Sequence, residues 1–315
     1  MANEPLVSVV VPTFNTKDCV RAAVDSALAQ DGVAVEVIVV DDASQDGTAD
    51  VVEEAYRDDA RVVLIRCEKN GGPSAARNIG FRAARGTWIA LLDSDDWWKP
   101  SRLARLLRHA DRADFIADNI MGYDVMAAAE TGPIYAGIGD RDLHLIDFIA
   151  PTSADRHDFG YLQPILRRSF LVEHSIAYRE SVRVGEDLLF NLDILSKGGR
   201  ATYVDEALYV YAMPVGLISR AASPYSRSTV DTGPLMAALV EMRDRIAPRL
   251  NPEEATAFAE RLTELDRQAS IAAFHRARAR SDFGEMVKLI ARERAVRDKI
   301  LERIAHTARS AIGTR

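Results

Sequence analysis

The stretch Trp88-Ile89-Ala90-Leu91-Leu92-Asp93-Ser94-Asp95-Asp96-Trp97 decides the fold. Its first five residues are apolar or small, which predicts a buried strand with no face toward water. Three carboxylates, those of Asp93, Asp95 and Asp96, follow where that strand ends. Because such close carboxylates repel one another and resist burial, we expect a positive partner among them. A divalent cation, Mn²⁺ or Mg²⁺, meets this need and commonly binds together with a phosphate.

An Asp-x-Asp triplet alone is a weak signal. A second one, Asp140-Arg141-Asp142, follows two glycines and is interpreted as a loop that leads into a helix. For residues 93–96, the alternative to a metal site is a solvated turn or an N-cap of the helix that begins near Pro100. The rest of the chain has to decide between these interpretations.

The composition is that of an ordinary globular protein, with 315 residues, 48% hydrophobic and 28% charged. A net charge of −7 argues against nucleic acid as a partner, because a phosphate backbone favours a basic surface. Cys19 and Cys67 lie far apart, so we expect no disulfide scaffold and no zinc site. With no signal-peptide pattern and no run of about 18 apolar residues, we expect a cytoplasmic protein, soluble or peripheral to the inner face of the cytoplasmic membrane.

Strands and helices alternate over the first part of the chain. Short valine-rich runs predict buried strands, and apolar residues at helical spacing predict helices between them. This order favours an α/β fold with a parallel sheet and right-handed crossovers. The predicted strands are residues 6–11, 35–40, 62–66 and 88–92, and the predicted helices are residues 18–30, 46–57 and 73–85.

Polar side chains gather where these strands end. Residues 13–15 follow the first strand, Asp41 and Asp42 follow the second, and Asp93 and Asp95 follow the fourth. In open parallel sheets, ligands bind at the carboxyl ends of the strands. The first loop has neither G-x-G-x-x-G nor G-x-x-x-x-G-K-[ST], which disfavours a Rossmann dinucleotide site and a P-loop. The pattern therefore predicts a nucleotide-type site of another kind.

The pattern after Pro100 is less regular. Gly185-Glu186-Asp187 precedes a stripe of leucines at helical spacing, which places both acids in the first turn of a helix. Acids are favourable there through the helix dipole alone, and this explanation suffices for Glu186. The other predicted elements are helices over 100–109, 142–149 and 169–174, strands over 115–121, 201–204 and 207–211, and a glycine-punctuated hairpin or excursion over 126–138.

The composition changes near residue 214. We predict one domain over residues 1–213, a linker rich in Ser, Pro and Gly over 214–234, and an all-helical region over 235–315. Residues 288–315 carry eight Lys or Arg against three acids, and apolar residues 300, 304, 308 and 312 share one face. Such a helix can contact anionic lipid, or it can pack on a partner or on its own domain, and both interpretations stay open.

Five motifs follow one another along the chain: Val9–Asn15, Val39–Thr48, Asn70–Asn78, Leu92–Asp96 and Gly185–Asp187. This ordered set resembles the family 2 glycosyltransferases of GT-A fold. The first two motifs look like the opening signatures of that family, and the other three continue them in the family's order.

The resemblance covers the chain from about residue 6 to residue 211. Gln163-Pro164 and Val184–Phe190 are similar to segments of the bacterial exopolysaccharide branch of the family. The sequence as a whole is similar to the succinoglycan-type glucosyltransferases of that branch. The resemblance implies a three-layer α/β/α sandwich, with a mostly parallel sheet and a C-terminal all-helical extension.

The resemblance also implies an inverting, metal-dependent transferase. It would move a sugar, with UDP-glucose as the leading donor, to a glycan or lipid-linked oligosaccharide in exopolysaccharide or cell-surface polysaccharide biosynthesis. UDP-GlcNAc, UDP-galactose and UDP-glucuronate are alternative donors. A nucleotidyltransferase and a non-catalytic nucleotide-sugar binding module are competing classes, although residues 12–15 lack the glycines and basic residues that a triphosphate needs. A homo-oligomer and membrane contact through the basic C-terminal helices stay open.

By resemblance, Asp42 would accept a hydrogen bond from the uracil N3–H, and residues 12–14 would wall the base. Asp41 would be structural or directed at the ribose. Asn70, Gly71 and Arg77 would lie along the nucleotide. The full expected nucleotide-sugar site is Pro12, Thr13, Phe14, Asn15, Asp41, Asp42, Asn70, Gly71, Arg77, Asp93, Ser94 and Asp95.

Asp95 would coordinate the metal, and Asp93 is the second candidate ligand, or it faces the ribose or the donor sugar. The metal would neutralise the departing diphosphate. Inversion requires one base opposite the leaving group, for which Asp187 is the first candidate and Glu186 the second. Asp96 is the candidate for an N-cap.

One departure from the family concerns positive charge at the leaving group. Many relatives carry Arg or His just after the last strand, whereas Tyr211–Gly216 has neither. No histidine occurs between His174 and His275. Arg220 is a candidate substitute, and the metal is expected to rely on Asp95, phosphate oxygens and water.

Overall fold

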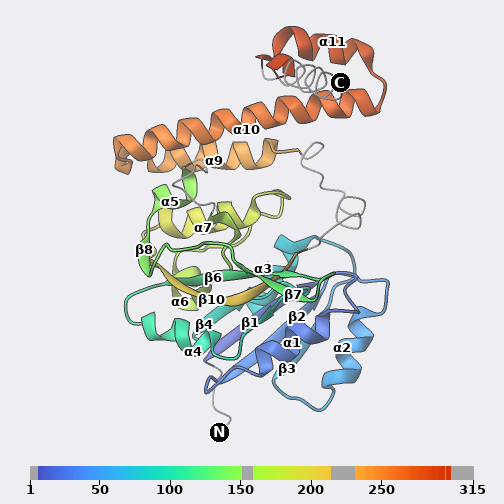
Figure 1. The fold of residues 1–315 in the computed structure, drawn as a ribbon, viewed down its shortest axis with the longest axis vertical. Helices are drawn as coiled ribbons and strands as arrows, with labels where there is room; N and C mark the ends of the chain where they lie inside the picture. Colours follow the sequence, from blue (N-terminus) through green and yellow to red (C-terminus); the bar gives the residue numbers. More distant parts are fainter. Residues whose placement is uncertain (1–5, 151–158, 214–230, 295, 299–315) are drawn as a thin grey trace, which may run out of the picture. The chain divides into compact units, whose positions relative to one another are not determined.

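The computed structural model describes residues 6–150, 159–213, 231–294 and 296–298 (Figure 1). The chain divides into two compact units, residues 1–215 and 216–315, and each is described by itself. Arg220 and the predicted apolar face over 300–312 lie outside the described residues. The domain boundaries expected from the sequence stay predictions.

Among the described residues, the first unit contains a ten-stranded sheet with the main order β3-β2-β1-β4-β9-β6-β10-β5. Its first four strands run parallel and confirm the four strands predicted from the apolar runs. All residues of β1 and β2 are buried, which explains why neither strand alternates in polarity. These strands are β1 (Val7–Thr13), β2 (Val35–Asp41), β3 (Val62–Arg66) and β4 (Trp88–Leu91).

Helices cover both faces of this parallel part (Figure 1). The chain runs from β1 through β2 to β3 in one direction across the sheet, and β4 then lies on the other side of β1. Right-handed crossovers therefore place α1 (Val20–Leu28) and α2 (Thr48–Tyr56) on one face of the sheet and α3 (Pro73–Ala83) on the other face. A Cβ at Gly80 of α3 would lie 2.3 Å from a methyl carbon of Val10, so the helix packs directly on β1. The strand order reverses between β1 and β4, which is where ligand-binding loops gather.

The other half of the sheet is mixed. β9 runs antiparallel to β4 and β6, β10 runs parallel to β6, and β5 runs antiparallel to β10. Within residues 126–138, where a hairpin or an excursion is expected, β7 pairs antiparallel with β6, so the hairpin includes a strand that lies before this range. The elements are β5 (Trp97–Trp98), α4 (Arg102–Leu106), η1 (Leu107–His109), β6 (Phe115–Asp124), β7 (Ala129–Pro133), β8 (Arg141–Leu143), α5 (Leu145–Ile149), η2 (Phe159–Tyr161), β9 (Ile165–Arg167), α6 (Arg168–Glu173), α7 (Glu186–Ser196) and β10 (Ala201–Met213).

The structure corrects three expectations in this half. Two residues of the loop expected over 140–142, Arg141 and Asp142, belong to β8, which pairs antiparallel with β10, and the helix expected from residue 142 begins at Leu145. The two late strands are one strand, β10, with irregular pairing between Val204 and Tyr209. Strand β9 was not expected, because three residues show no readable periodicity.

The second unit is helical in its described part, as expected. It contains α9 (Gly233–Ile246), η3 (Ala247–Arg249), α10 (Pro252–Ala279) and α11 (Phe283–Arg292), and α9 takes in the last two residues of the predicted linker. Asn251 and Glu254 form a capping box that starts α10. Across the described parts of both units, no helix is long and apolar enough to cross a membrane.

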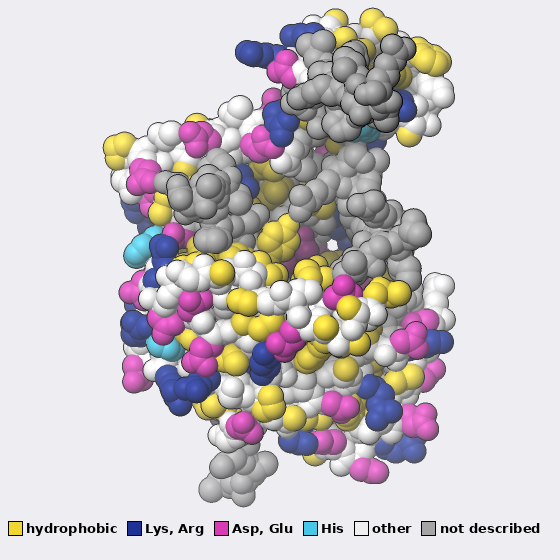
Figure 2. Space-filling view, viewed as in Figure 1, with side chains coloured by type: hydrophobic (Ala, Val, Ile, Leu, Met, Phe, Trp, Pro, Cys, Tyr) yellow, Lys and Arg dark blue, Asp and Glu magenta, His cyan; other side chains and the backbone are white. Residues whose placement is uncertain are grey.

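Charged side chains of both signs are interspersed with apolar ones on the face shown in Figure 2. On the described part of that face, no continuous basic stripe stands out.

A buried ion pair fixes β10 against α4 and β6. Arg102 Nη2 lies 2.8 Å from Asp118 Oδ1, and the two side chains are 0% and 1% exposed. Tyr209 of β10 donates its backbone N–H to Asp118 Oδ2 at 2.9 Å. The rings of Trp98 and Tyr209 lie 4.5 and 5.2 Å from the guanidinium carbon of Arg102. This pair therefore holds Tyr209 in place beside the strand-end carboxylates.

We expect Arg102→Met to lower the free energy of unfolding by about 3–5 kcal/mol, because it leaves the Asp118 carboxylate buried without its counter-charge. The double variant Arg102→Met/Asp118→Leu removes both charges and should cost much less. Urea denaturation measures both losses. A double variant as unstable as the single one would contradict the role given to charge.

Candidate active site

Hydrogen bonds tie together the loops that follow β1 and β2. Asn15 has a φ of 55°, and its Oδ1 accepts from the backbone N–H of Gln45 at 2.8 Å. The backbone N–H of Asn15 donates to the hydroxyl of Ser44 at 2.9 Å. Asp41 Oδ2 accepts from the backbone N–H of Ser44 at 3.1 Å. Asn15 and Asp41 therefore shape these loops, whatever they do toward a ligand.

Asp42 holds the loop that precedes α3. Its two carboxylate oxygens accept from the backbone N–H groups of Gly71 and Gly72, each at 2.7 Å. The Asn70 side chain donates to the Asp42 carbonyl at 3.2 Å, and the Asp42 N–H donates to the Thr13 carbonyl at 2.9 Å. Each carboxylate oxygen has a second lone pair, so Asp42 retains acceptor capacity for a ligand.

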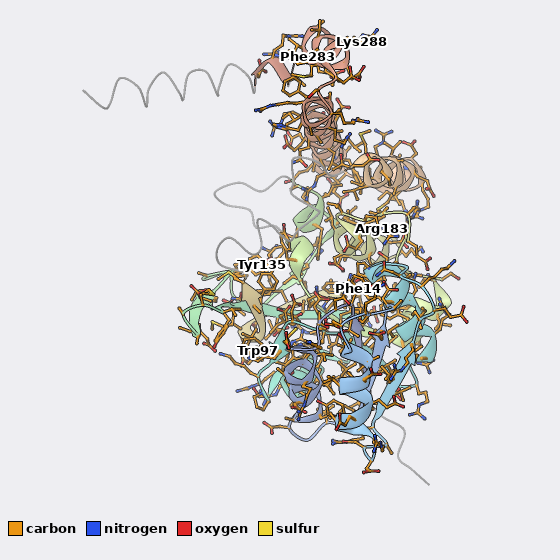
Figure 3. The ribbon with its side chains drawn as sticks, turned by 90° about the vertical axis from the view of Figure 1, so that its right-hand side faces the viewer. Phe14, Trp97, Tyr135, Arg183, Phe283 and Lys288 are labelled. Carbon is orange, nitrogen blue, oxygen red and sulfur yellow. The ribbon has the colours of Figure 1, made fainter. Side chains whose placement is uncertain are left out.

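Pro12 and Thr13 end β1 and are buried, whereas Phe14 is 46% exposed (Figure 3). The Thr13 hydroxyl also forms a hydrogen bond with the hydroxyl of Thr16. An exposed aromatic ring in this loop is available to contact a planar ligand.

Arg77 of α3 is the buried centre of an ion-pair cluster with three partly exposed carboxylates, the Arg77 cluster. Its side chain is 4% exposed, and its Nη2 lies 2.8 Å from Asp93 Oδ1. Its Nη1 lies 3.2 Å from Asp187 Oδ1 and 3.7 Å from Glu186 Oε1. The carboxylate after β4 and the two acids that open α7 therefore share one guanidinium.

Burial and charge set the protonation of this cluster. Burial disfavours the charged form of Arg77, but Asp187 and Asp93 outweigh it and raise the pKa of Arg77 well above its ordinary value. Burial, together with the Asp187 charge, raises the pKa of Glu186 to about 7. Burial also raises the pKa of Asp187, while Arg77 and a hydrogen bond from Tyr178 oppose that rise. The raised pKa of Glu186 favours its neutral form, which relieves its repulsion with Asp187.

Tyr178 lies outside every sequence motif, yet it contacts the first candidate base. Its hydroxyl donates to Asp187 Oδ1 at 2.8 Å. Its ring stacks on Phe190 of α7 with centroids 4.2 Å apart and planes 3° apart. Its backbone N–H and carbonyl both bond the Asn78 side chain of α3, at 2.9 and 3.0 Å. Asn78 closes the third predicted motif, so the sequence marked one partner of this contact and missed the other.

Asp96 bonds the sheet and not the following helix. It is 1% exposed and accepts from the Tyr209 hydroxyl at 2.7 Å and from the Ala212 N–H at 2.8 Å. Burial, with the charges of Asp93 and Asp95, raises the pKa of Asp96 to about 8. The N-cap expected of Asp96 is wrong, because α4 begins later, with Ser101 as its N-cap residue.

Asp95 is exposed and, among the described residues, has no hydrogen-bond or ion-pair partner in another side chain. Asp93, by contrast, accepts from Arg77 at 2.8 Å and from the Gln163 side chain at 3.4 Å, and Ser94 between them is buried. No group of three His, Cys, Asp or Glu side chains in the described ranges could hold a metal ion. An Mg²⁺-type ion needs only one or two carboxylates when phosphates and water supply the other ligands. Asp95 fits such an ion.

Arg183 is an exposed cation beside the loop that Asp42 holds (Figure 3). A Cβ at Gly72 would lie 1.7 Å from Arg183 Nη1, so the guanidinium packs on the bare Cα of that glycine. Within the described ranges, Arg183 has no hydrogen-bond or ion-pair partner. Its position two residues before Gly185 carried no signal in the sequence.

The model of the family described as Glycosyl transferase family 2 matches residues 8–167. Succinoglycan biosynthesis protein ExoO of Rhizobium meliloti (strain 1021) is 40% identical over 227 residues, which are 69% of this chain and 63% of that protein. Succinoglycan biosynthesis protein ExoU of the same strain is 35% identical over 212 residues, which are 64% of this chain and 60% of that protein. The chain thus spans less than two thirds of the length of these two relatives.

Two solved structures share the fold. S. aureus TarS 1–349 in complex with UDP-GlcNAc has a TM-score of 0.65 at 23% identity, over 85% of this chain and 80% of that one. Mannosyltransferase PcManGT from Pyrobaculum calidifontis, in complex with GDP-Man and Mn²⁺, has a TM-score of 0.56 at 18% identity, over 100% and 89%. They confirm the expected GT-A fold. Since the family model spans half of the chain and the motifs occur in the family's order, the chain belongs to glycosyl transferase family 2.

Proposed function

We propose that the protein is an inverting, metal-dependent glycosyltransferase that moves a sugar from a UDP-sugar to a glycan or lipid-linked oligosaccharide. The observation that carries this proposal is the Arg77 cluster, which gathers a strand-end carboxylate and two helix-start acids around one cation. The names of ExoO and ExoU support a role in polysaccharide biosynthesis. UDP-glucose is the leading donor, and UDP-GlcNAc, the ligand in the TarS structure, is the first alternative.

The loops after β1 and β2 would bind the uridine. Asp42 would accept the uracil N3–H with a remaining lone pair, and Phe14 would contact the base. Asp95 would hold the metal with phosphate oxygens and water, and Asp93 is the second candidate. When bound, the metal would neutralise charge on the departing diphosphate.

Asp187 would act as the base. It would take the proton of the acceptor hydroxyl while that oxygen bonds to the anomeric carbon and the bond from this carbon to the diphosphate breaks. Glu186 stays the alternative, because a pKa of about 7 also suits a base at neutral pH.

We expect Asp187→Asn to lower metal-dependent UDP release by about 10²–10⁴-fold while UDP still binds, because the amide cannot take the proton. Asp95→Ala should lose the response to the metal. The assay is UDP release over a panel of UDP-sugars with Mn²⁺, Mg²⁺ or EDTA. Full turnover by Asp187→Asn would refute the base assignment, and a selective loss in Glu186→Gln would move that role to Glu186.

Arg183 would supply the positive charge that the loop after Tyr211 lacks in its described part. We expect Arg183→Gln to weaken UDP binding by about tenfold and to leave uridine binding unchanged, because only UDP carries phosphates for a charged hydrogen bond. Calorimetric titration of each variant with UDP and uridine measures this. Arg82→Gln, an exposed arginine on α3, is the control. Equal losses for both ligands would contradict a phosphate contact.

A further inference from the structure

We propose that Tyr178 is a positioning residue that determines which oxygen of Asp187 faces the acceptor. This inference rests on the proposed function. Asp187 Oδ1 accepts from the Tyr178 hydroxyl at 2.8 Å and lies 3.2 Å from Arg77 Nη1. Among the described residues, Asp187 Oδ2 has no hydrogen-bond partner. The two oxygens of this carboxylate are therefore not equivalent.

This difference has a chemical consequence for proton transfer. The Tyr178 hydroxyl donates a hydrogen bond to Oδ1, and the Arg77 guanidinium lies closest to the same oxygen, so a proton is disfavoured at Oδ1 and Oδ2 is the oxygen that accepts it. As the acceptor O–H bond breaks, the new O–H bond forms at Oδ2. The acceptor oxygen bonds to the anomeric carbon, and the diphosphate leaves with the electrons of the broken bond. A carboxylate held in one orientation adopts fewer arrangements in which it cannot take the proton of the acceptor hydroxyl.

Tyr178 is itself held by both helices that carry the Arg77 cluster. Its side chain is buried, and it stacks on Phe190, three residues after Asp187 on α7. The side chain of Asn78, the residue after Arg77 on α3, accepts a hydrogen bond from the Tyr178 backbone N–H and donates one to the Tyr178 carbonyl. The hydroxyl is thus fixed relative to the guanidinium and to the carboxylate together.

The Tyr178 hydroxyl also affects the proton affinity of Asp187. The charged groups that face Asp187 are Arg77 on α3, Asp93 after β4 and Glu186 on α7. A hydrogen bond to the ionised carboxylate lowers its pKa, so removing the hydroxyl raises the pKa of Asp187. Because the base must be ionised, the acidic limb of the pH–rate profile should then move to higher pH.

Tyr178→Phe removes only the hydroxyl and keeps the stacked ring. We expect kcat to fall by about tenfold, the acidic limb to move to higher pH, and UDP affinity to stay unchanged. The control is Tyr203→Phe, because Tyr203 is also buried and donates its hydroxyl to an aspartate, Asp205, at 3.1 Å. The control should keep the kcat and the pH profile of the wild type.

The outcomes separate the two proposals. Wild-type kcat and an unshifted acidic limb in Tyr178→Phe would overturn the positioning role, as would equal kcat losses in Tyr178→Phe and Tyr203→Phe without a shift. A wild-type protein that binds UDP but releases none from any donor–acceptor pair would instead overturn the proposed function, and with it the premise of this inference. Full activity of Asp187→Asn would overturn the inference alone and leave glycosyl transfer standing.

Discussion

The guanidinium of Arg77 is the interaction on which the site depends. Carboxylates gathered after β4 need a positive partner, and the described structure supplies an arginine from α3 at Asp93. The same guanidinium reaches Asp187 and Glu186 on α7. A buried carboxylate without such a partner is costly, so α3, the end of β4 and the start of α7 must all be in place together. One ion-pair cluster thereby joins elements that lie about a hundred residues apart in the chain.

The polar residues at the strand ends serve the fold before they serve any ligand. Asp42 bonds two glycine N–H groups, and Asn15 and Asp41 bond the loop after β2. A polar residue at a strand end is therefore not sufficient evidence of a ligand site, because the same carboxylates accept hydrogen bonds from backbone N–H groups of the loops. The second lone pair of each Asp42 oxygen and the exposed ring of Phe14 remain available to a ligand.

The sequence predicted the elements that have a continuous apolar run or helical spacing, and it missed contacts made by irregular segments. β1 and β2 are seven-residue buried strands, so their apolar runs were readable. β9 has three residues, and it pairs only because β4 and β6 lie on either side of it. Tyr178 and Arg183 lie between α6 and α7, outside regular structure, so no spacing related them to Asp187 or Gly72. Their roles depend on packing that brings distant segments together.

The carboxylates of the site fall into three physical classes. Asp93 and Asp187 are paired with Arg77. Asp96 is buried with two donors from β10, and burial raises its pKa to about 8, while burial beside Asp187 raises the pKa of Glu186 to about 7. Asp95 belongs to neither class, because it is exposed and, in the described ranges, without a partner. The fold thus provides partners for Asp93, Asp96 and Asp187 and leaves Asp95 exposed without one, so Asp95 is the first candidate for a cation with its phosphates and Asp93 the second.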